Sequence, residues 1–193
     1  MFDREHRTLA YVPRWAIIRV NRRQSVAEHS FYVAMYAFEI AKFIGFKGSY
    51  ENLLSWALTH DMEEIVKGDP PSSYHQITKT ETSKEWVRTK MAERSSSTSA
   101  YAFTRDPGGL RVVAIVKLAD IVESLLYLGD EENSGNGRNV CNVQSYLWEK
   151  LNEQWKEFMT ATGVDDDTAR SLSASIAEAI YRARLSTDKL VHE

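Results

Sequence analysis

The chain has 193 residues, of which 43% are hydrophobic and 26% charged, and its net charge is −3. This length suits one domain that buries an ordinary hydrophobic core without disulfides. A mildly acidic chain is a poor candidate for a protein that holds long DNA or RNA by its phosphates, although a small anionic ligand needs only a local basic pocket.

The cysteine content and the hydropathy of the chain indicate its cellular location. Cys141 is the only cysteine, so the chain can form neither an intrachain disulfide nor a zinc site built from thiolates. Residues 1–10 carry charges where a secretory signal would carry an apolar run. No stretch approaches the roughly 18 apolar residues of a membrane helix. We therefore expect a cytoplasmic protein that does not contact membranes.

Prolines and glycines are scarce, and they predict where the first helices end. Ser25 and Glu28 match a capping box, after which apolar residues recur every three or four positions up to Gly45. A second helix is expected over residues 50–67, because Gly68 and then two prolines follow it.

The rest of the chain continues this pattern. Serine, proline and glycine predict loops over residues 95–99 and 106–109, and the acidic, glycine-rich residues 130–137 predict another. The remaining helices that we expect are residues 80–94, 110–128, 139–162 and 166–190. Together these elements predict an all-α fold, a single domain over residues 1–193 built as a bundle of about six or seven helices.

The most informative feature is the pair formed by His60 and Asp61, which lies inside an otherwise apolar helix. A histidine beside an aspartate is costly there unless a partner satisfies both side chains. Imidazole and carboxylate together bind divalent transition metals such as Zn, Mn, Co, Fe or Ni. The pair therefore predicts a metal site.

Two further polar residues lie on apolar helix faces. His29, on the first turn of the capped helix, would by itself more often be a core histidine. Asp120 would by itself as readily form a structural salt bridge with Arg111 or Lys117. Taken with the histidine–aspartate pair, they make two imidazoles and two carboxylates from three helices. Such a set closes around one divalent ion and leaves positions open for water and a phosphate oxygen.

Two acidic residues follow the pair. Glu64 lies four residues after His60, on the same face of the expected helix, where it would orient or deprotonate an attacking water. Alone, it would be surface charge like its neighbour Glu63. Asp69, at the turn after the helix, would bind a ligand hydroxyl or a second metal ion.

These residues also carry a resemblance to a known family. His29, then His60 with Asp61, then Asp120 is similar to the signature of HD-domain phosphohydrolases. The closer resemblance is to the bacterial 5′-deoxynucleotidase family, often called YfbR-like, and it rests on RW at 14–15, VAEHS at 26–30, HDMEE at 60–64, GDP at 68–70 and KLAD at 117–120.

The resemblance does not extend evenly along the chain. It covers residues 9–128, which we expect to hold the metal-site core. Residues 72–109 do not follow the family pattern, and the C-terminal helices over 139–190 follow it only in helical character. Related phage enzymes that hydrolyse dATP to deoxyadenosine and triphosphate, and phosphohydrolases of nucleotide-antibiotic pathways, share this frame.

The resemblance implies a role for each matching residue in the reaction. Glu64 would position the nucleophilic water with Asp61, and Arg14 and Lys117 would contact the phosphate. The metal ligands that it implies are His29, His60, Asp61 and Asp120.

It also implies how the substrate is bound. Trp15 would pack against the sugar at C2′ and leave no room for a ribose 2′-hydroxyl. Asp69 would bind the 3′-hydroxyl, or further metal ions in the triphosphate-cleaving relatives. Ile17 would line the base pocket, which makes adenine attractive as the base.

The activity implied is metal-dependent hydrolysis of 2′-deoxyribonucleoside 5′-monophosphates to deoxynucleosides and phosphate. The first alternative is a purine-directed enzyme that releases triphosphate from dATP, and the second is a catalytically silent helical domain that binds nucleotides. The cofactor expected is a divalent transition metal (Co, Mn, Zn, Fe or Ni), with additional Mg as an option. The partners expected are a small deoxyribonucleotide and, through the C-terminal helices, further copies of the chain as a homo-oligomer.

Overall fold

The structure is a computed structural model, and it describes residues 4–69, 85–86, 89–90 and 107–185. Within these ranges the chain forms helices and no strand, apart from one isolated antiparallel bridge between Pro13 and Ser25. The all-α prediction is therefore confirmed. The predicted loop over 95–99 and most of the helix predicted over 80–94 lie outside the described residues.

Long helices dominate the described part of the chain. Its elements are η1 (Arg4–Tyr11), α1 (Val26–Phe43), α2 (Tyr50–Thr59), α3 (Glu64–Lys67), α6 (Pro107–Glu131), η3 (Glu132–Asn136), α7 (Gly137–Thr162) and α8 (Asp166–Leu185). Among the described helices, none combines the length and the apolarity needed to cross a lipid bilayer. That one domain extends over all 193 residues stays a prediction.

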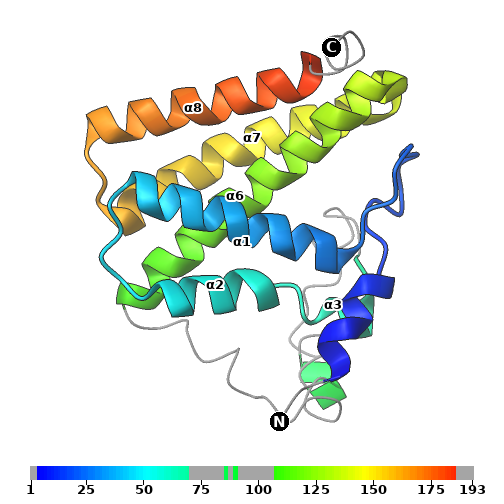
Figure 1. Cartoon of the computed structure of the whole chain (residues 1–193), viewed down its shortest axis with the longest axis horizontal. Helices are drawn as coiled ribbons and strands as arrows, with labels where there is room; N and C mark the ends of the chain where they lie inside the picture. The colour runs from blue at the N-terminus through cyan, green and yellow to red at the C-terminus, as the bar shows by residue number, and fades with distance from the viewer. Residues whose placement is uncertain (1–3, 70–84, 87–88, 91–106, 186–193) are drawn as a thin grey trace, which may run out of the picture.

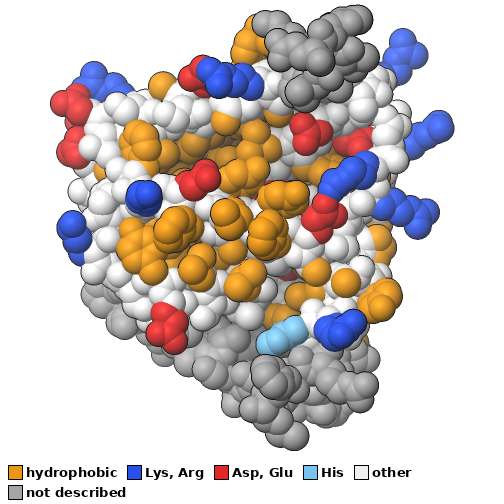
Figure 2. Space-filling view, viewed as in Figure 1, with side chains coloured by type: hydrophobic (Ala, Val, Ile, Leu, Met, Phe, Trp, Pro, Cys, Tyr) orange, Lys and Arg blue, Asp and Glu red, His pale blue; other side chains and the backbone are white. Residues whose placement is uncertain are grey.

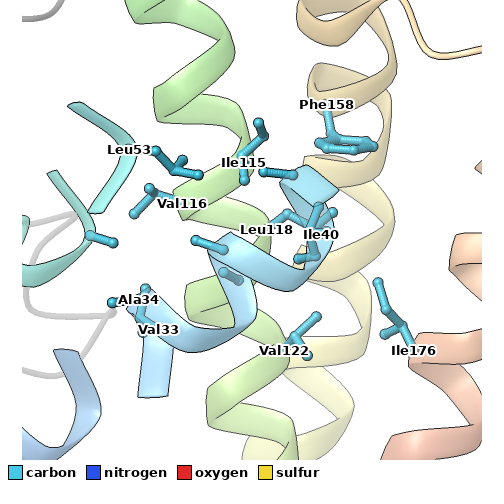
Figure 3. Close-up of a cluster of buried hydrophobic side chains, with 14 of the residues drawn as sticks. Val33, Ala34, Ile40, Leu53, Ile115, Val116, Leu118, Val122, Phe158 and Ile176 are labelled. Carbon is cyan, nitrogen blue, oxygen red and sulfur yellow. The ribbon is translucent and has the colours of Figure 1, made fainter. Parts of the chain in front are cut away.

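Helix α6 is the centre of the bundle. It packs against α1, α2, α7 and α8, and in Figure 1 α1 crosses in front of it while α7 and α8 lie along one side. A helix covered by neighbours on several sides carries apolar residues around most of its circumference. Figure 3 shows the resulting core, in which the labelled side chains are Val33, Ala34, Ile40, Leu53, Ile115, Val116, Leu118, Val122, Phe158 and Ile176.

Helix α1 begins and ends where its sequence predicts. The Ser25 hydroxyl accepts a hydrogen bond from the Glu28 amide at 3.2 Å, which satisfies one of the free amides of the first turn. Gly45 follows the helix with a φ of 63°, a conformation that glycine adopts without strain. The cap places His29 on the inward face of the first turn, where it is fully buried.

The continuous helix predicted over residues 50–67 is wrong. Helix α2 ends at Thr59, a tight turn follows, and α3 begins at Glu64. The imidazole Nδ1 of His60 lies 2.7 Å from the Ala57 carbonyl, which in an uninterrupted helix would accept the amide of Asp61. This competition between side chain and backbone interrupts the helix at the histidine–aspartate pair.

The loop predicted over 106–109 is wrong for the three of its residues that the structure describes. Residues 107–109 belong to the first turn of α6, where proline is tolerated because its missing amide hydrogen is not needed.

The loop predicted over 130–137 is partly correct. Residues 130 and 131 complete α6 and Gly137 begins α7, but the chain kinks within η3, where Ser134 (φ −78°, ψ 16°) and Gly135 (φ 86°, ψ 8°) have non-helical backbone. The buried Glu131 carboxylate orders this stretch, since it accepts hydrogen bonds from the amides of Asn21 and Arg22 and from the Asn136 side chain.

Candidate metal centre

The four predicted metal ligands come together from three parts of the fold. His29 lies on α1, His60 and Asp61 lie in the turn after α2, and Asp120 lies on α6. His29 Nε2 is 3.1 Å from Asp120 Oδ1 and 3.6 Å from Asp61 Oδ2. His60 Nε2 is 3.3 Å from the same Asp61 oxygen. One ligand atom each from His29, His60 and Asp120 lies within 4.8 Å of the others.

This cluster fits a divalent metal ion. The Nε2 atoms of His29 and His60 are buried without a hydrogen-bond partner of good geometry, and such atoms are costly to leave unsatisfied. Both point toward carboxylate oxygens, and imidazole nitrogen with carboxylate oxygen is a donor set that divalent transition metals bind. A cation among these atoms would satisfy both imidazoles and neutralise both carboxylates.

Both imidazole rings are held through their Nδ1 atoms. His29 Nδ1 is 2.5 Å from Glu123 Oε2, and His60 Nδ1 is 2.7 Å from the Ala57 carbonyl oxygen. The Ala57 carbonyl can only accept, so His60 Nδ1 carries the proton and His60 Nε2 presents its lone pair. His29 Nδ1 lies between Glu123 Oε2, which accepts, and Arg14 Nη1 at 2.6 Å, which only donates, so these two contacts orient the His29 ring.

Glu123 connects the metal ligands to the N-terminal segment, and the sequence analysis missed it. Its carboxylate is 3% exposed and accepts from Gln24 Nε2 at 2.6 Å and from Arg14 Nη1 at 3.2 Å, in addition to His29. The signal that could have identified it is its position three residues after Asp120, on the same apolar helix.

Arg14 is a buried cation beside the ligands. Its Nη1 donates to Gln24 Oε1 at 3.2 Å, and its Nε is 3.7 Å from Asp69 Oδ2. Burial lowers the pKa of the guanidinium, but Glu123, Asp120 and other nearby carboxylates outweigh burial and raise it above its usual value. Arg14 therefore keeps its positive charge beside the metal-ligand cluster.

Trp15 is held on several sides. Its ring stacks on Tyr127 with the planes 4° apart and the centroids 5.4 Å apart, and the Arg14 guanidinium lies 4.8 Å from its centroid. Its Nε1 donates to Gln24 Oε1 at 3.0 Å, and its backbone amide donates to Asp69 Oδ2 at 3.3 Å. Its φ of 64° is unusual for a bulky residue, so these contacts also stabilise a strained backbone.

Glu64 lies in an acidic environment. The residue is 6% exposed, and its Oε2 has no hydrogen-bond partner among the described residues. Burial first, and then the nearby charges of Asp61 and Asp69, raise the pKa of the Glu64 carboxyl to about 10. Burial also raises the pKa of Asp69, although Arg14 opposes it. A cation at the centre would reduce this repulsion and favour ionised Glu64.

The metal ligands influence each other in the same way. Burial and the Arg14 charge lower the pKa of His29, yet its close contacts with the carboxylates of Asp120 and Glu123 raise it to about 9. Burial raises the pKa of Asp120. The contact with His29 and the positive charges nearby outweigh burial, so the pKa of Asp120 lies well below its usual range. A metal ion bound here would take the place of the second His29 proton, because only neutral imidazole is a ligand.

Two predicted substrate contacts are exposed side chains that make no hydrogen bond or ion pair with the metal ligands in the described part of the chain. The Lys117 side chain is 56% exposed, and its ammonium is 3.7 Å from the Glu157 carboxylate on α7. Ile17 is 67% exposed, whereas its neighbour Ile18 packs in a small apolar cluster with Tyr127. The roles expected for Lys117 and Ile17 stay predictions.

Comparison with known proteins identifies the family. Residues 2–161 match the model of a family described as 5′-deoxynucleotidase YfbR-like. The chain belongs to this YfbR-like family. A 5′-deoxynucleotidase of Erwinia tasmaniensis is 30% identical over 78% of the chain and 84% of the relative. A dATP triphosphohydrolase of cyanophage S-2L is 24% identical over 82% of the chain and 85% of the relative.

Solved structures share the fold of this YfbR-like protein. The HD phosphohydrolase DatZ of cyanophage S-2L, solved with dA and one catalytic Zn²⁺, superposes with a TM-score of 0.73 at 22% identity, covering 94% of this chain and 98% of DatZ. A protein from Pyrococcus horikoshii OT3 gives a TM-score of 0.67 at 22% identity, covering 91% and 96%. The resemblance found in the sequence is confirmed, and the family match continues past residue 128 into α7.

Proposed function

We propose that this YfbR-like protein hydrolyses the 5′-phosphate of 2′-deoxyribonucleoside monophosphates with the help of a divalent metal ion. The observation that carries the proposal is the meeting of four metal-binding side chains with a buried arginine and a fixed tryptophan, His29 being 2.6 Å from Arg14. The 5′-deoxynucleotidase relative at 30% identity supports the same reaction.

The metal ligands in this proposal are His29, His60, Asp61 and Asp120. A metal ion held there would supply an activated water and polarise the phosphoryl group. Beside it, the buried Glu64 carboxylate would orient the water and accept its proton.

Phosphate recognition depends on the N-terminal segment. Arg14 would neutralise charge that develops on the phosphoryl oxygens, and its contacts to Gln24 and Glu123 fix the guanidinium before substrate binds. The ion pair of Lys117 with Glu157 gives no support for a second cation at the same phosphate.

Sugar recognition would use Asp69 and Trp15, which contact each other beside the metal ligands. Asp69 accepts from the Trp15 amide, so the carboxylate that would bind the 3′-hydroxyl also orients the indole that would close off C2′. A wall at C2′ rejects ribonucleotides by sterics and leaves their 2′-hydroxyl without compensation for its lost hydration.

A dATP triphosphohydrolase is the second candidate activity. The cyanophage S-2L enzyme with that name matches a similar share of the chain, at lower identity than the 5′-deoxynucleotidase. The ligand set and Glu64 are the same for both reactions, which differ only in the groups attached to the α-phosphate. A silent binding domain is not favoured, since no expected ligand is missing.

One product assay separates these activities. Metal-stripped protein would receive Co²⁺, Mn²⁺, Mg²⁺ or Zn²⁺ and then dAMP, dGMP, dCMP, TMP, AMP or the matching triphosphates, with phosphate and triphosphate resolved as products. Phosphate from dNMPs, with AMP a poor substrate, is the result expected. Triphosphate from dATP would favour the second candidate, and no turnover with any metal would refute both.

Assembly and location complete the proposal. We propose a homo-oligomer in the cytoplasm, where the exposed thiol of Cys141 would stay reduced.

A further inference from the structure

The outward face of α1 carries a row of large apolar side chains, which we call the α1 stripe. Its members are 38% to 53% exposed, and they are Phe31, Tyr32, Met35, Phe38 and Phe43. Figure 2 shows hydrophobic side chains gathered over α1 in the middle of this face of the molecule. A contiguous apolar patch of this kind marks an interaction surface more often than plain solvent-facing surface.

The spacing of the stripe is that of a helix-pairing seam. Phe31, Met35 and Phe38 follow one another at intervals of four and three, and the next position on this row is Lys42. Intervals of four and three keep side chains on one line facing a partner helix. The inward face of α1 is already packed against α2 and α6, and the described helices leave the α1 stripe partly exposed.

The charges on α1 indicate which partner this is. Glu28 and Lys42 lie seven residues before and seven residues after Met35, which returns each of them to nearly the same helix face. Antiparallel pairing with an identical helix about Met35 sets Glu28 of each copy opposite Lys42 of the other. Glu28 pairs with Arg22 in its own chain, so Lys42 of the second copy would join that ion pair. Parallel pairing would set like charges opposite each other, which is unfavourable.

We propose that α1 pairs antiparallel with α1 of a second copy of this chain, about a two-fold axis at Met35. In this arrangement Met35 meets its own counterpart, Tyr32 meets Phe38, and Phe31 packs beside the stem of Glu39, so each contact occurs twice, as a two-fold interface requires. By contrast, α8 exposes large apolar side chains only near its C-terminal end, at Tyr181 and Leu185, and presents small polar residues such as Ser171 and Ser175 before them. The interface is therefore placed on α1 rather than on the C-terminal helices.

The first test is the oligomeric state of the full chain by sedimentation velocity at micromolar concentrations. A dimer is expected, and Met35→Glu should raise its dissociation constant at least about tenfold, because two carboxylates would meet at the axis. Tyr181→Glu makes a similar change on the exposed face of α8 and should leave the dimer intact. Circular dichroism confirms that both variants are folded. A monomeric wild-type chain, or a folded Met35→Glu dimer as tight as wild type, would overturn the proposal.

The second test fixes the orientation by disulfide trapping in a Cys141→Ser background. Met35→Cys chains should cross-link to each other under mild oxidation. Tyr32→Cys chains should cross-link to Phe38→Cys chains in a mixture but not among themselves, because antiparallel copies of position 32 are displaced about 9 Å along the helix axis. Self-linking of Tyr32→Cys chains, or no link at Met35→Cys, would refute the antiparallel seam. This result does not depend on whether the protein hydrolyses deoxyribonucleotides.

Discussion

The metal centre and the α6–α7–α8 layer are held together by different interactions. In the layer, Phe158, Leu172 and Ile176 pack with α6 in a cluster of apolar side chains. Around the centre, Glu123 accepts hydrogen bonds from Gln24 and His29, which precede it by 99 and 94 residues. The layer needs apolar residues at helical spacing, whereas the centre needs particular polar atoms at particular places. Substitutions should therefore separate loss of chemistry from loss of stability.

The largest effect is expected at the metal centre itself. Asp61→Ala removes the carboxylate that faces both histidine Nε2 atoms, so metal content and dAMP turnover should both fall below detection while the helical signal persists. Elemental analysis and the product assay measure this. The matched control is Glu63→Ala, which removes a half-exposed carboxylate from the same turn and should stay active. An active, metal-replete Asp61→Ala protein would disprove the site.

The opposite outcome is expected in the layer. Phe158 is fully buried on α7, and Phe158→Ala should lower the free energy of unfolding by about 3–5 kcal/mol. Denaturant titration measures the loss, and the protein that remains folded should keep its metal. Tyr181→Ala, at an exposed position, should change stability by less than about 0.5 kcal/mol. If Phe158→Ala also removed the metal from folded protein, the two regions would not be separable.

Glu123→Gln tests the polar connection between the regions. The amide keeps the shape of the side chain but weakens the acceptor for His29 Nδ1 and Arg14. Metal affinity should fall about 10- to 100-fold, as measured by competition with a chelating dye. Glu157→Gln, an exposed carboxylate on α7, serves as the control. Equal affinities in the two variants would show that Glu123 does not orient the ligand.

The smallest effect is expected at the sugar wall. Trp15→Ala should raise the ratio of kcat/KM for AMP to that for dAMP about tenfold, as removal of a steric barrier to one hydroxyl implies. Tyr127→Ala should move the ratio in the same direction by less, because Trp15 would lose its stacking partner but keep its other contacts. Steady-state kinetics on both substrates measure this, with Tyr181→Ala as the control. An unchanged ratio in Trp15→Ala would exclude the steric gate.

Helical spacing and end signals predicted most of the fold. The Ser25 cap, the end of α1 before Gly45 and the acidic start of α8, where Asp165 accepts from the Thr168 amide, agree with the structure. These features are local, so neighbouring residues suffice to predict them. The interruption of the predicted helix over 50–67 is different. Helix α2 ends at the histidine–aspartate pair because the His60 side chain contacts the Ala57 carbonyl, and the spacing of apolar residues does not predict such a contact.

The polar shell around the ligands was harder to predict than the ligands. His60 with Asp61 is conspicuous in an apolar helix, but Glu123 resembles an ordinary surface charge until its distant partners are known. The left-handed backbone of Trp15 has no local signature either. Such features depend on contacts between residues about a hundred positions apart, which a single sequence does not reveal.

The side chain of Gln24 has a thermodynamic consequence. Its Oε1 accepts from Trp15 and Arg14 while its Nε2 donates to Glu123, which in turn holds His29. One amide of fixed orientation thus joins the substrate wall to a metal ligand. If a bound nucleotide changes the affinity for the metal by some factor, the bound metal must change the affinity for the nucleotide by the same factor. Titration with metal and titration with nucleotide should therefore report one shared coupling energy, and Gln24→Ala should reduce it.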